Sequence, residues 1–176
     1  MNLYKLLLVF GLSTLIWTES FSQQIQGSML LDWNSKGQSA QVKVNDAPGA
    51  MKLNLTTGAF EWMAKTDVLV VNADPAVQAQ MQALWVDGGD RLIIIRSEGV
   101  ALRKGTQKLM GMVNFNGRQV QVPMELSIRQ KGESYELSGN MTISIAQLGM
   151  VLPSNSEAEM GDNWEISWGP TTYQAF

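Results

Sequence analysis

Apolar and polar residues alternate with a period of two over most of the chain after residue 28. The clearest case is residues 120–130, where every second side chain is apolar: Val120, Val122, Met124, Leu126 and Ile128. A strand with one dry and one wet face produces this pattern. Pro123 lies on the wet face and cannot donate to a sheet ladder, which indicates a bulge or an edge there.

Three further segments repeat this alternation, and turn signals separate two of them from residues 120–130. The segments are residues 109–115, 134–145 and 163–168. Asn116-Gly117 is a strong two-residue hairpin signal, and Lys131-Gly132-Glu133 is also typical of a hairpin turn. Each segment has one apolar face, so the series predicts antiparallel strands that close into a barrel or pack as a sandwich.

The first half of the chain is less regular. Alternation over residues 42–44, 51–55, 60–62 and 100–102 predicts short strands. Continuous apolar runs at residues 68–71 and 92–95 predict strands that are buried on both faces or lie next to a covering element. One short helix is expected to begin at Asp74-Pro75, with an apolar face made by Val77, Met81, Leu84 and Trp85. The expected fold is therefore all-β, with eight or nine strands and one helix.

The first 22 residues have the three parts of an export signal. Lys5 precedes a largely apolar run over residues 6–17, and small residues follow at Ser20 and Ser22. The run is too short to cross a bilayer comfortably, which takes about 20 apolar residues. We therefore expect a cleaved signal peptide over residues 1–22 and a domain over residues 23–176, periplasmic or secreted. The sequence has no Cys, so no lipid-modified cysteine can act as a stable membrane anchor.

Composition removes several classes of function. With no His and no Cys, the sequence has no Ser-His-Asp or Cys-His catalytic group and no zinc site built from those ligands. The net charge of −3 and the lack of basic runs argue against nucleic acid as a partner. A hydrolase or isomerase built on two carboxylates stays a third hypothesis, but no such pair shows in the sequence. The protein is expected not to be an enzyme.

Three stretches in the second half resemble the YceI-like family of exported bacterial proteins, which have a lipocalin-like antiparallel barrel. Residues 108–117 are similar to the family's glycine-containing hairpin, and residues 119–126 to the valine-and-proline strand that follows it. Residues 137–150, followed by Pro153-Ser154, are similar to its closing segment. The family's His-containing segment is absent.

The resemblance implies a barrel of about eight strands that binds a long apolar molecule, such as a polyisoprenoid or an isoprenoid quinone. No other cofactor is expected. Burial of apolar surface contributes about 25 cal/mol per Å², so a long tail can bind without any charged contact. The side chains expected to line the interior are Trp62, Val113, Phe115, Val122, Met124, Leu126, Leu137, Met141, Ile143, Trp164 and Ile166.

An alternative interpretation of the same residues is that they fill the barrel as an ordinary core. The protein would then be a structural or interaction module of the cell envelope that acts through its surface, with Tyr173 and Phe176 as candidate docking residues. The sequence leaves open whether the barrel is hollow and whether the protein forms a homodimer.

Overall fold

The computed structural model describes residues 24–36, 41–68, 71–72, 75, 78–79, 82–83, 91–97, 105–115, 117–149 and 161–175. These ranges are almost entirely β-structure. The strands are β1 (Gln24–Lys36), β2 (Gln41–Asn54), β3 (Phe60–Lys65), β4 (Val71–Asn72), β5 (Leu92–Ser97), β6 (Gly105–Phe115), β7 (Arg118–Lys131), β8 (Ser134–Ser144) and β9 (Asn163–Gln174), and a 3₁₀ turn, η1, spans Thr66–Val68.

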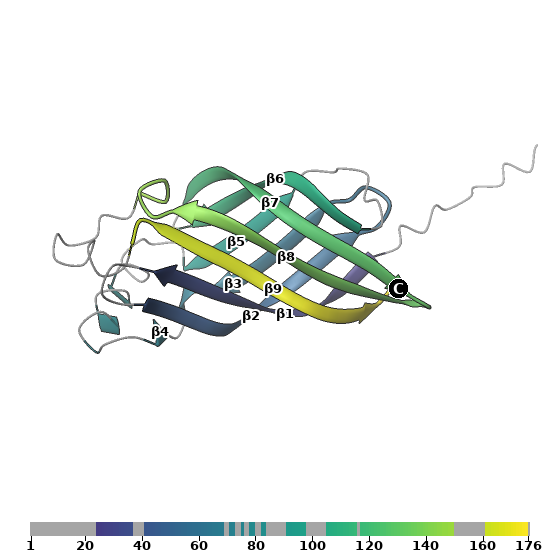
Figure 1. Ribbon diagram of the computed structural model, residues 1–176, viewed down its shortest axis with the longest axis horizontal. Helices are drawn as coiled ribbons and strands as arrows, with labels where there is room; N and C mark the ends of the chain where they lie inside the picture. Colours follow the sequence, from purple (N-terminus) through teal and green to yellow (C-terminus); the bar gives the residue numbers. More distant parts are fainter. Residues whose placement is uncertain are drawn as a thin grey trace, which may run out of the picture.

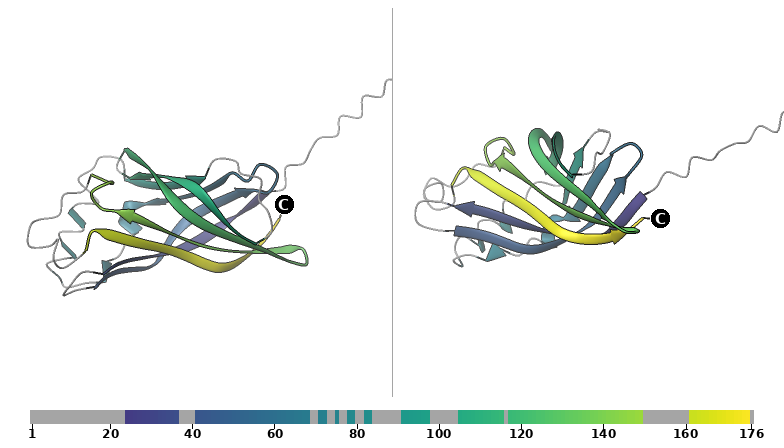
Figure 2. Two further views of the ribbon diagram at one scale, coloured as in Figure 1. Left: turned by 45° about the horizontal axis from the view of Figure 1, so that its top comes forward. Right: turned by 45° about the vertical axis from the view of Figure 1, so that its right-hand side comes forward.

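Eight of these strands close into a barrel. The order around it is β1-β9-β8-β7-β6-β5-β3-β2, and β1 also pairs with β2, so the sheet returns to its first strand. The pairings are antiparallel, and the two-residue β4 adds to the side of β2 (Figure 1). Figure 2 shows the sheet curling around on itself from two further directions. Closure removes the exposed sheet edges that an open sheet would carry.

Alternate residues of each long strand face the interior, as the period of two predicts. Buried inward side chains come from all eight barrel strands and form one cluster. The polar buried residues are few among the described ranges: Ser35, Thr66 and Ser97. The core of the domain is therefore the inner wall of the barrel, and the expected all-β, lipocalin-like architecture is confirmed.

Several local predictions are confirmed. Phe115 pairs with Arg118 across the Gly117 turn, and Lys131 pairs with Ser134 across the Gly132 turn. Both glycines have positive φ, a conformation that glycine adopts at little cost. Pro123 pairs with Met110 of β6, but the pairing of β7 with β8 begins only at Met124. Proline is thus placed where one side of the strand has no ladder partner.

Other local predictions need correction. The strand β1 was not recognised from the sequence, and the two strands expected over residues 42–44 and 51–55 are parts of one long strand that ends at Asn54. Val68 belongs to a 3₁₀ turn, although a continuous strand was expected over residues 68–71. The run at residues 92–95 forms β5, but it is not buried on both faces: Leu92 is exposed and Ile94 is half-buried.

The helix expected after Asp74 is partly described. Pro75, Gln78, Ala79, Gln82 and Ala83 are helical. The residues expected on its apolar face, Val77, Met81, Leu84 and Trp85, lie outside the described residues, as do the signal peptide and residues 100–102. No helix in the described ranges has the length and apolar character needed to cross a bilayer.

Candidate functional site

The eleven side chains predicted to line the interior all lie there. Each is at most 2% exposed. They come from five strands: β3 holds Trp62, β6 holds Val113 and Phe115, β7 holds Val122, Met124 and Leu126, β8 holds Leu137, Met141 and Ile143, and β9 holds Trp164 and Ile166. The barrel therefore brings them to one apolar surface, while their role as ligand contacts stays a prediction.

The sequence reading missed a large share of this surface, mainly on β1, β2 and β5. The inward residues it omitted are Ile25, Met29, Leu31, Trp33, Val44, Ala47, Met51, Leu53, Phe60, Ile93, Ile95 and Trp168. Alternation over Gln24–Lys36 was the available signal, since Ile25, Met29, Leu31 and Trp33 occupy one parity. The apolar side chain of Leu30, which lies on the outer face, obscured this alternation, and Ile94 did the same in β5.

Large inward side chains lie on inward glycines of the neighbouring strands. A Cβ atom added at Gly49 or at Gly139 would lie 2.3 Å from the ring of Trp62 or of Trp168, respectively. Two further pairs are Met124 on Gly111 and Tyr173 on Gly27, with corresponding distances of 2.6 and 2.9 Å. Alternation of small and large residues lets the rings lie against the wall of the barrel.

Aromatic side chains meet across part of the interior. Phe60 of β3 stacks on Trp168 of β9 with ring centroids 6.0 Å apart, although β1 and β2 separate these strands in the sheet. Trp33 and Trp164, on neighbouring strands, meet edge to face at 5.8 Å. At the level of the Phe60–Trp168 stack, the interior is therefore occupied by side chains in this structure.

Only some of the polar atoms on the inner wall have hydrogen-bond partners. The Trp62 Nε1–H donates to the Met29 carbonyl oxygen at 3.0 Å, and the Tyr173 hydroxyl donates to the Ser28 carbonyl oxygen at 2.9 Å. Among the described residues, the buried Trp33 Nε1, Trp168 Nε1 and Ser97 Oγ find none. Buried polar atoms are usually paired, so these three offer unused hydrogen-bonding capacity.

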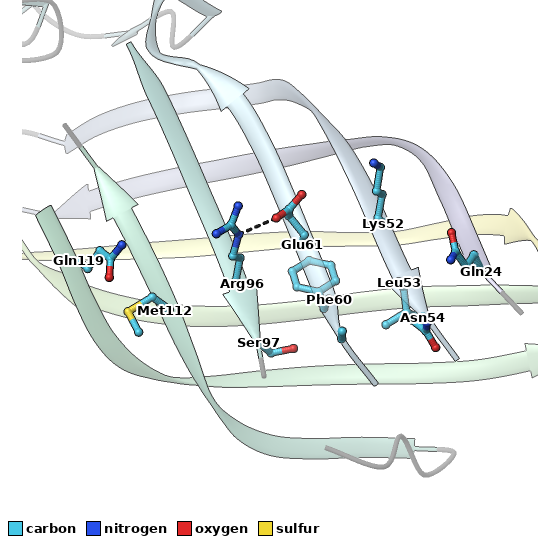
Figure 3. A pocket seen from close by; sticks show the side chains of 11 residues that line it. Gln24, Lys52, Leu53, Asn54, Phe60, Glu61, Arg96, Ser97, Met112 and Gln119 are labelled. Carbon is cyan, nitrogen blue, oxygen red and sulfur yellow. Dashed lines mark hydrogen bonds and ion pairs between the residues drawn. The ribbon is translucent and has the colours of Figure 1, made fainter. Parts of the chain in front are cut away.

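A hollow of about 490 Å³ opens at the end of the barrel where β1 begins and β2 ends. We call it the rim hollow (Figure 3). It reaches the inward Leu53, Phe60 and Ser97, and its outer side is lined by Lys52, Glu61 and Arg96 among others. Arg96 Nε lies 2.6 Å from Glu61 Oε2. Leu53, Phe60 and Ser97 are at most 6% exposed, so the rim hollow borders the buried wall without opening onto it, and most of its lining belongs to the outer face.

The ionisable groups of the described ranges show no sign of a catalytic centre. No group of three or more carboxylates there could hold a metal ion. Burial raises the pKa of the Tyr173 phenol, with a hydrogen bond from Thr171 acting in the opposite direction. The Lys131 ammonium lowers the pKa of the half-buried Glu136 by a hydrogen bond. Tyr173 is buried against Gly27, so it is not available as the surface docking residue considered above, and Phe176 lies outside the described residues.

No protein-family model matches the sequence, and no curated protein matches it. Solved structures do match. A polyisoprenoid-binding domain from Saccharophagus degradans, described as implicated in plant cell wall breakdown, superimposes with a TM-score of 0.62 at 12% identity and covers 87% of this chain and 98% of its own. Burkholderia cenocepacia BcnA gives a TM-score of 0.60 at 14% identity, covering 85% of this chain and 96% of its own. The resemblance to the YceI-like family is therefore confirmed at the level of the fold, a closed lipocalin-like antiparallel barrel of eight strands.

Proposed function

We propose that the protein is an exported, non-enzymatic carrier or sequestration protein that binds a long apolar lipid-like molecule inside the barrel. The observation that carries this proposal is the continuous apolar inner wall, to which all eight barrel strands contribute. A structural neighbour described as a polyisoprenoid-binding domain supports a polyisoprenoid or an isoprenoid quinone as the ligand. The export signal predicted over residues 1–22 supports a site of action in the periplasm or outside the cell.

The unused donors refine the class of ligand. A pure hydrocarbon would leave Trp168 Nε1 and Ser97 Oγ without partners, because it has no acceptor to offer. A lipid with a carbonyl, hydroxyl or phosphate oxygen at one end would satisfy them while its tail lies along the apolar wall. Ser97 lines the rim hollow, so this polar end belongs there and the tail points inward.

A titration with prenyl alcohols of increasing length tests this function. Tryptophan fluorescence of the protein is the readout of binding. Trp33, Trp62, Trp164 and Trp168 all lie on the inner wall, so ligand entry should change the emission. Each buried methylene contributes about 0.8 kcal/mol, so affinity should rise with tail length until the lumen is full. An absence of binding, or an affinity that does not depend on length, contradicts the proposal.

A matched pair of variants separates the lumen from the outer surface. Val122 points inward and its neighbour Gln121 points outward on the same strand. Val122→Trp should fill the lumen and weaken binding of the longest alcohol, whereas Gln121→Trp should leave it unchanged. Unfolding midpoints of both variants show whether the first change acts on the ligand site or on the fold.

One observation favours a second candidate, a barrel that is filled by its own side chains and acts through its surface. The Phe60–Trp168 stack already spans the interior at its level. If these rings do not move, no chain can pass them. The same titration decides between the two functions, because a filled barrel takes up no prenyl alcohol of any length.

A further inference from the structure

The outer surface of the barrel is divided into two unlike parts. The outward positions of β7, β8 and β9 are polar apart from Pro123 and the Gly169-Pro170 pair; they include Gln121, Glu125, Arg129, Glu136, Asn140, Thr142, Glu165, Ser167 and Thr172. These strands lie in front in Figure 1, with β3 and β5 behind them. The front of the barrel is therefore an ordinary solvated surface.

The outward positions of β1, β2, β3 and β5 are apolar at their centre. Leu30 pairs with Pro48, and Ala50, Met63 and Ile94 form one row across three strands. Leu30 is 46% exposed, Met63 38% and Leu92 36%. We call Leu30, Pro48, Ala50, Met63, Leu92 and Ile94 the apolar face. Single exposed apolar residues are common on protein surfaces, but an in-register group over four strands indicates a contact surface.

This face is also hollowed. An open depression of about 470 Å³ lies over Gly27 and Gly49, between Pro48, Ala50 and Met63. Both glycines face the barrel interior, so the residues that shape the depression on the outer side are Pro48, Ala50 and Met63. Side chains or acyl chains of a partner can therefore settle between Pro48 and Met63 instead of resting on a flat sheet.

Cations border the apolar face on two sides. Lys52 and Arg96 follow Ala50 and Ile94 along their strands, Lys65 pairs with Leu92, and Arg91 precedes Leu92. The acids nearest these cations are Glu61, which is paired with Arg96, and Asp67, which follows Lys65 by two residues. Lys52 and Lys65 have no ion-pair partner among the described residues. On the β1 side the face meets Asp32, whose Oδ1 accepts a hydrogen bond from the Asp46 N–H.

We propose that the apolar face docks reversibly on a lipid bilayer that contains anionic lipids. Leu30, Met63 and Leu92 would enter the boundary between headgroups and acyl chains, and Lys52, Lys65 and Arg91 would lie against lipid phosphates. A second copy of the chain fits less well, because a two-fold contact would bring the same cationic borders together. The docking goes beyond the carrier function and holds or fails independently of it.

Docking in this orientation would also place the rim hollow at the lipid surface. The row that contains Lys52, Glu61 and Arg96 lines the rim hollow and lies directly beside the row Ala50, Met63 and Ile94. A ligand that leaves the bilayer would then have a short path to Phe60. This consequence, unlike the docking itself, rests on the proposed carrier function.

Vesicle flotation of the purified mature protein tests the docking. The probes are vesicles of phosphatidylcholine alone and of phosphatidylcholine mixed with phosphatidylglycerol. We expect binding to the mixed vesicles that high salt weakens. Each basic residue near an anionic surface contributes about fivefold in affinity, so Lys52→Gln with Lys65→Gln should reduce binding about 25-fold. Leu30→Gln with Met63→Gln should abolish it.

Matched controls come from β6 and β7, outside the apolar face. Met110 is 54% exposed on β6 and lies outside the apolar face, so Met110→Gln should bind as the wild type does. The double variant Lys108→Gln with Arg129→Gln removes two cations from β6 and β7, outside the apolar face, and should also bind as the wild type does. Equal binding of all variants, or no binding by the wild type, overturns the proposal. The proposal is also overturned if the wild type self-associates without binding vesicles and the double variant Leu30→Gln with Met63→Gln does not self-associate. That result would assign the apolar face to a second copy of the chain.

Discussion

At the scale of single residues, the inner wall depends on glycines that make room for rings. Gly139 is the tightest of these positions, because an added Cβ would meet both the Trp168 ring at 2.3 Å and the Glu125 carbonyl oxygen at 2.4 Å. The ring can turn away, but the backbone oxygen cannot without disturbing the β7–β8 ladder. The identity of residue 139 is therefore set by two neighbours from two different strands.

Gly139→Ala is expected to lower the free energy of unfolding by about 1–3 kcal/mol, the usual cost of overpacking a well-packed core. Urea unfolding followed by tryptophan fluorescence measures the change. Ser138→Ala is the matched control, because it alters the adjacent residue on the outer face. Equal stability of the two variants would show that Trp168 does not lie on Gly139.

Tyr173 makes the stability of the protein depend on pH in the alkaline range. Burial raises the pKa of its phenol above the ordinary value near 10. The unfolded chain therefore loses this proton at a lower pH than the folded chain does. The contribution of Tyr173 to stability is complete below the ordinary pKa and is lost as pH rises toward the raised value.

Tyr173→Phe should flatten that alkaline loss of stability. It should also cost about 0.5–1.5 kcal/mol near neutral pH, because it removes the hydrogen bond to the Ser28 carbonyl oxygen. Thermal melts over a series of pH values provide the measurement, with Tyr135→Phe as the control on the neighbouring strand. Coinciding pH profiles of Tyr173→Phe and the wild type would contradict this role of the Tyr173 phenol.

Which residues face inward was largely predictable from the sequence, and which residues touch was not. Alternation alone placed Val122, Met124 and Ile143 correctly, since the period of a strand is a local property. The contact of Trp168 with Gly139, or of Trp62 with Gly49, depends on strand register. Glycines at inward positions of the alternating pattern indicate where a neighbouring ring can lie on the wall. Nothing in the sequence identifies which ring covers which glycine.

At the scale of elements, β9 shows how one extra residue limits a prediction. Trp168 pairs with Gly139 of β8, and Thr171 pairs with Leu137. Three residues on β9 therefore span two on β8, and Gly169-Pro170 form a bulge. The pairing of Ile25 with Ala175 carries the same shift relative to Leu31 with Trp168. The alternation breaks at this bulge, which is why the sequence predicted the last strand only as far as Trp168.

The sequence predicted the position of β5 correctly, but not how far its side chains are buried. Four consecutive apolar residues predicted a strand that is buried on both faces or lies next to a covering element, and yet Leu92 is exposed and Ile94 is half-buried on the outer face. The continuous apolar run arises because its outward residues, Leu92 and Ile94, belong to the apolar face together with Leu30 and Met63. The docking on a lipid surface that we propose above would account for that composition.

The strand β7 offers a test of the strand pairing itself. Its pairing with β8 begins at Met124, so Gln121 and Pro123 lie beyond it and Glu125 lies within it, opposite Asn140. Residues two apart on a strand direct their N–H groups to the same neighbour. Glu125→Pro should therefore cost about 1–3 kcal/mol, because it leaves a paired carbonyl of β8 without its donor. Gln121→Pro should cost clearly less.

Comparison of the two proline variants by urea unfolding gives the result. Loss of the Glu125–Lys108 ion pair adds little, because both groups are exposed and 3.5 Å apart. Glu125→Gln measures that small part directly. Equal costs for proline at residues 121 and 125 would contradict the observed end of the β7–β8 ladder.

At the scale of the whole molecule, closure of the barrel creates an interior that is apolar on every strand. Closure itself follows from β1 pairing with both β2 and β9, and β1 was the strand that the sequence did not reveal. The second half of the chain still predicted a barrel or a sandwich from its one-sided hairpins, and its resemblance to the YceI-like family favoured the barrel. Whether Phe60 and Trp168 leave room for a guest depends on their packing, which no local pattern encodes.

Native mass spectrometry of the mature protein, purified from a bacterial host without detergent, tests the carrier function most directly. We expect a species heavier than the apoprotein that carries an extractable apolar lipid, or uptake of an added isoprenoid quinone or polyprenol by the empty protein. A single species at the apoprotein mass, with no extractable lipid and no uptake of either compound, would contradict the account.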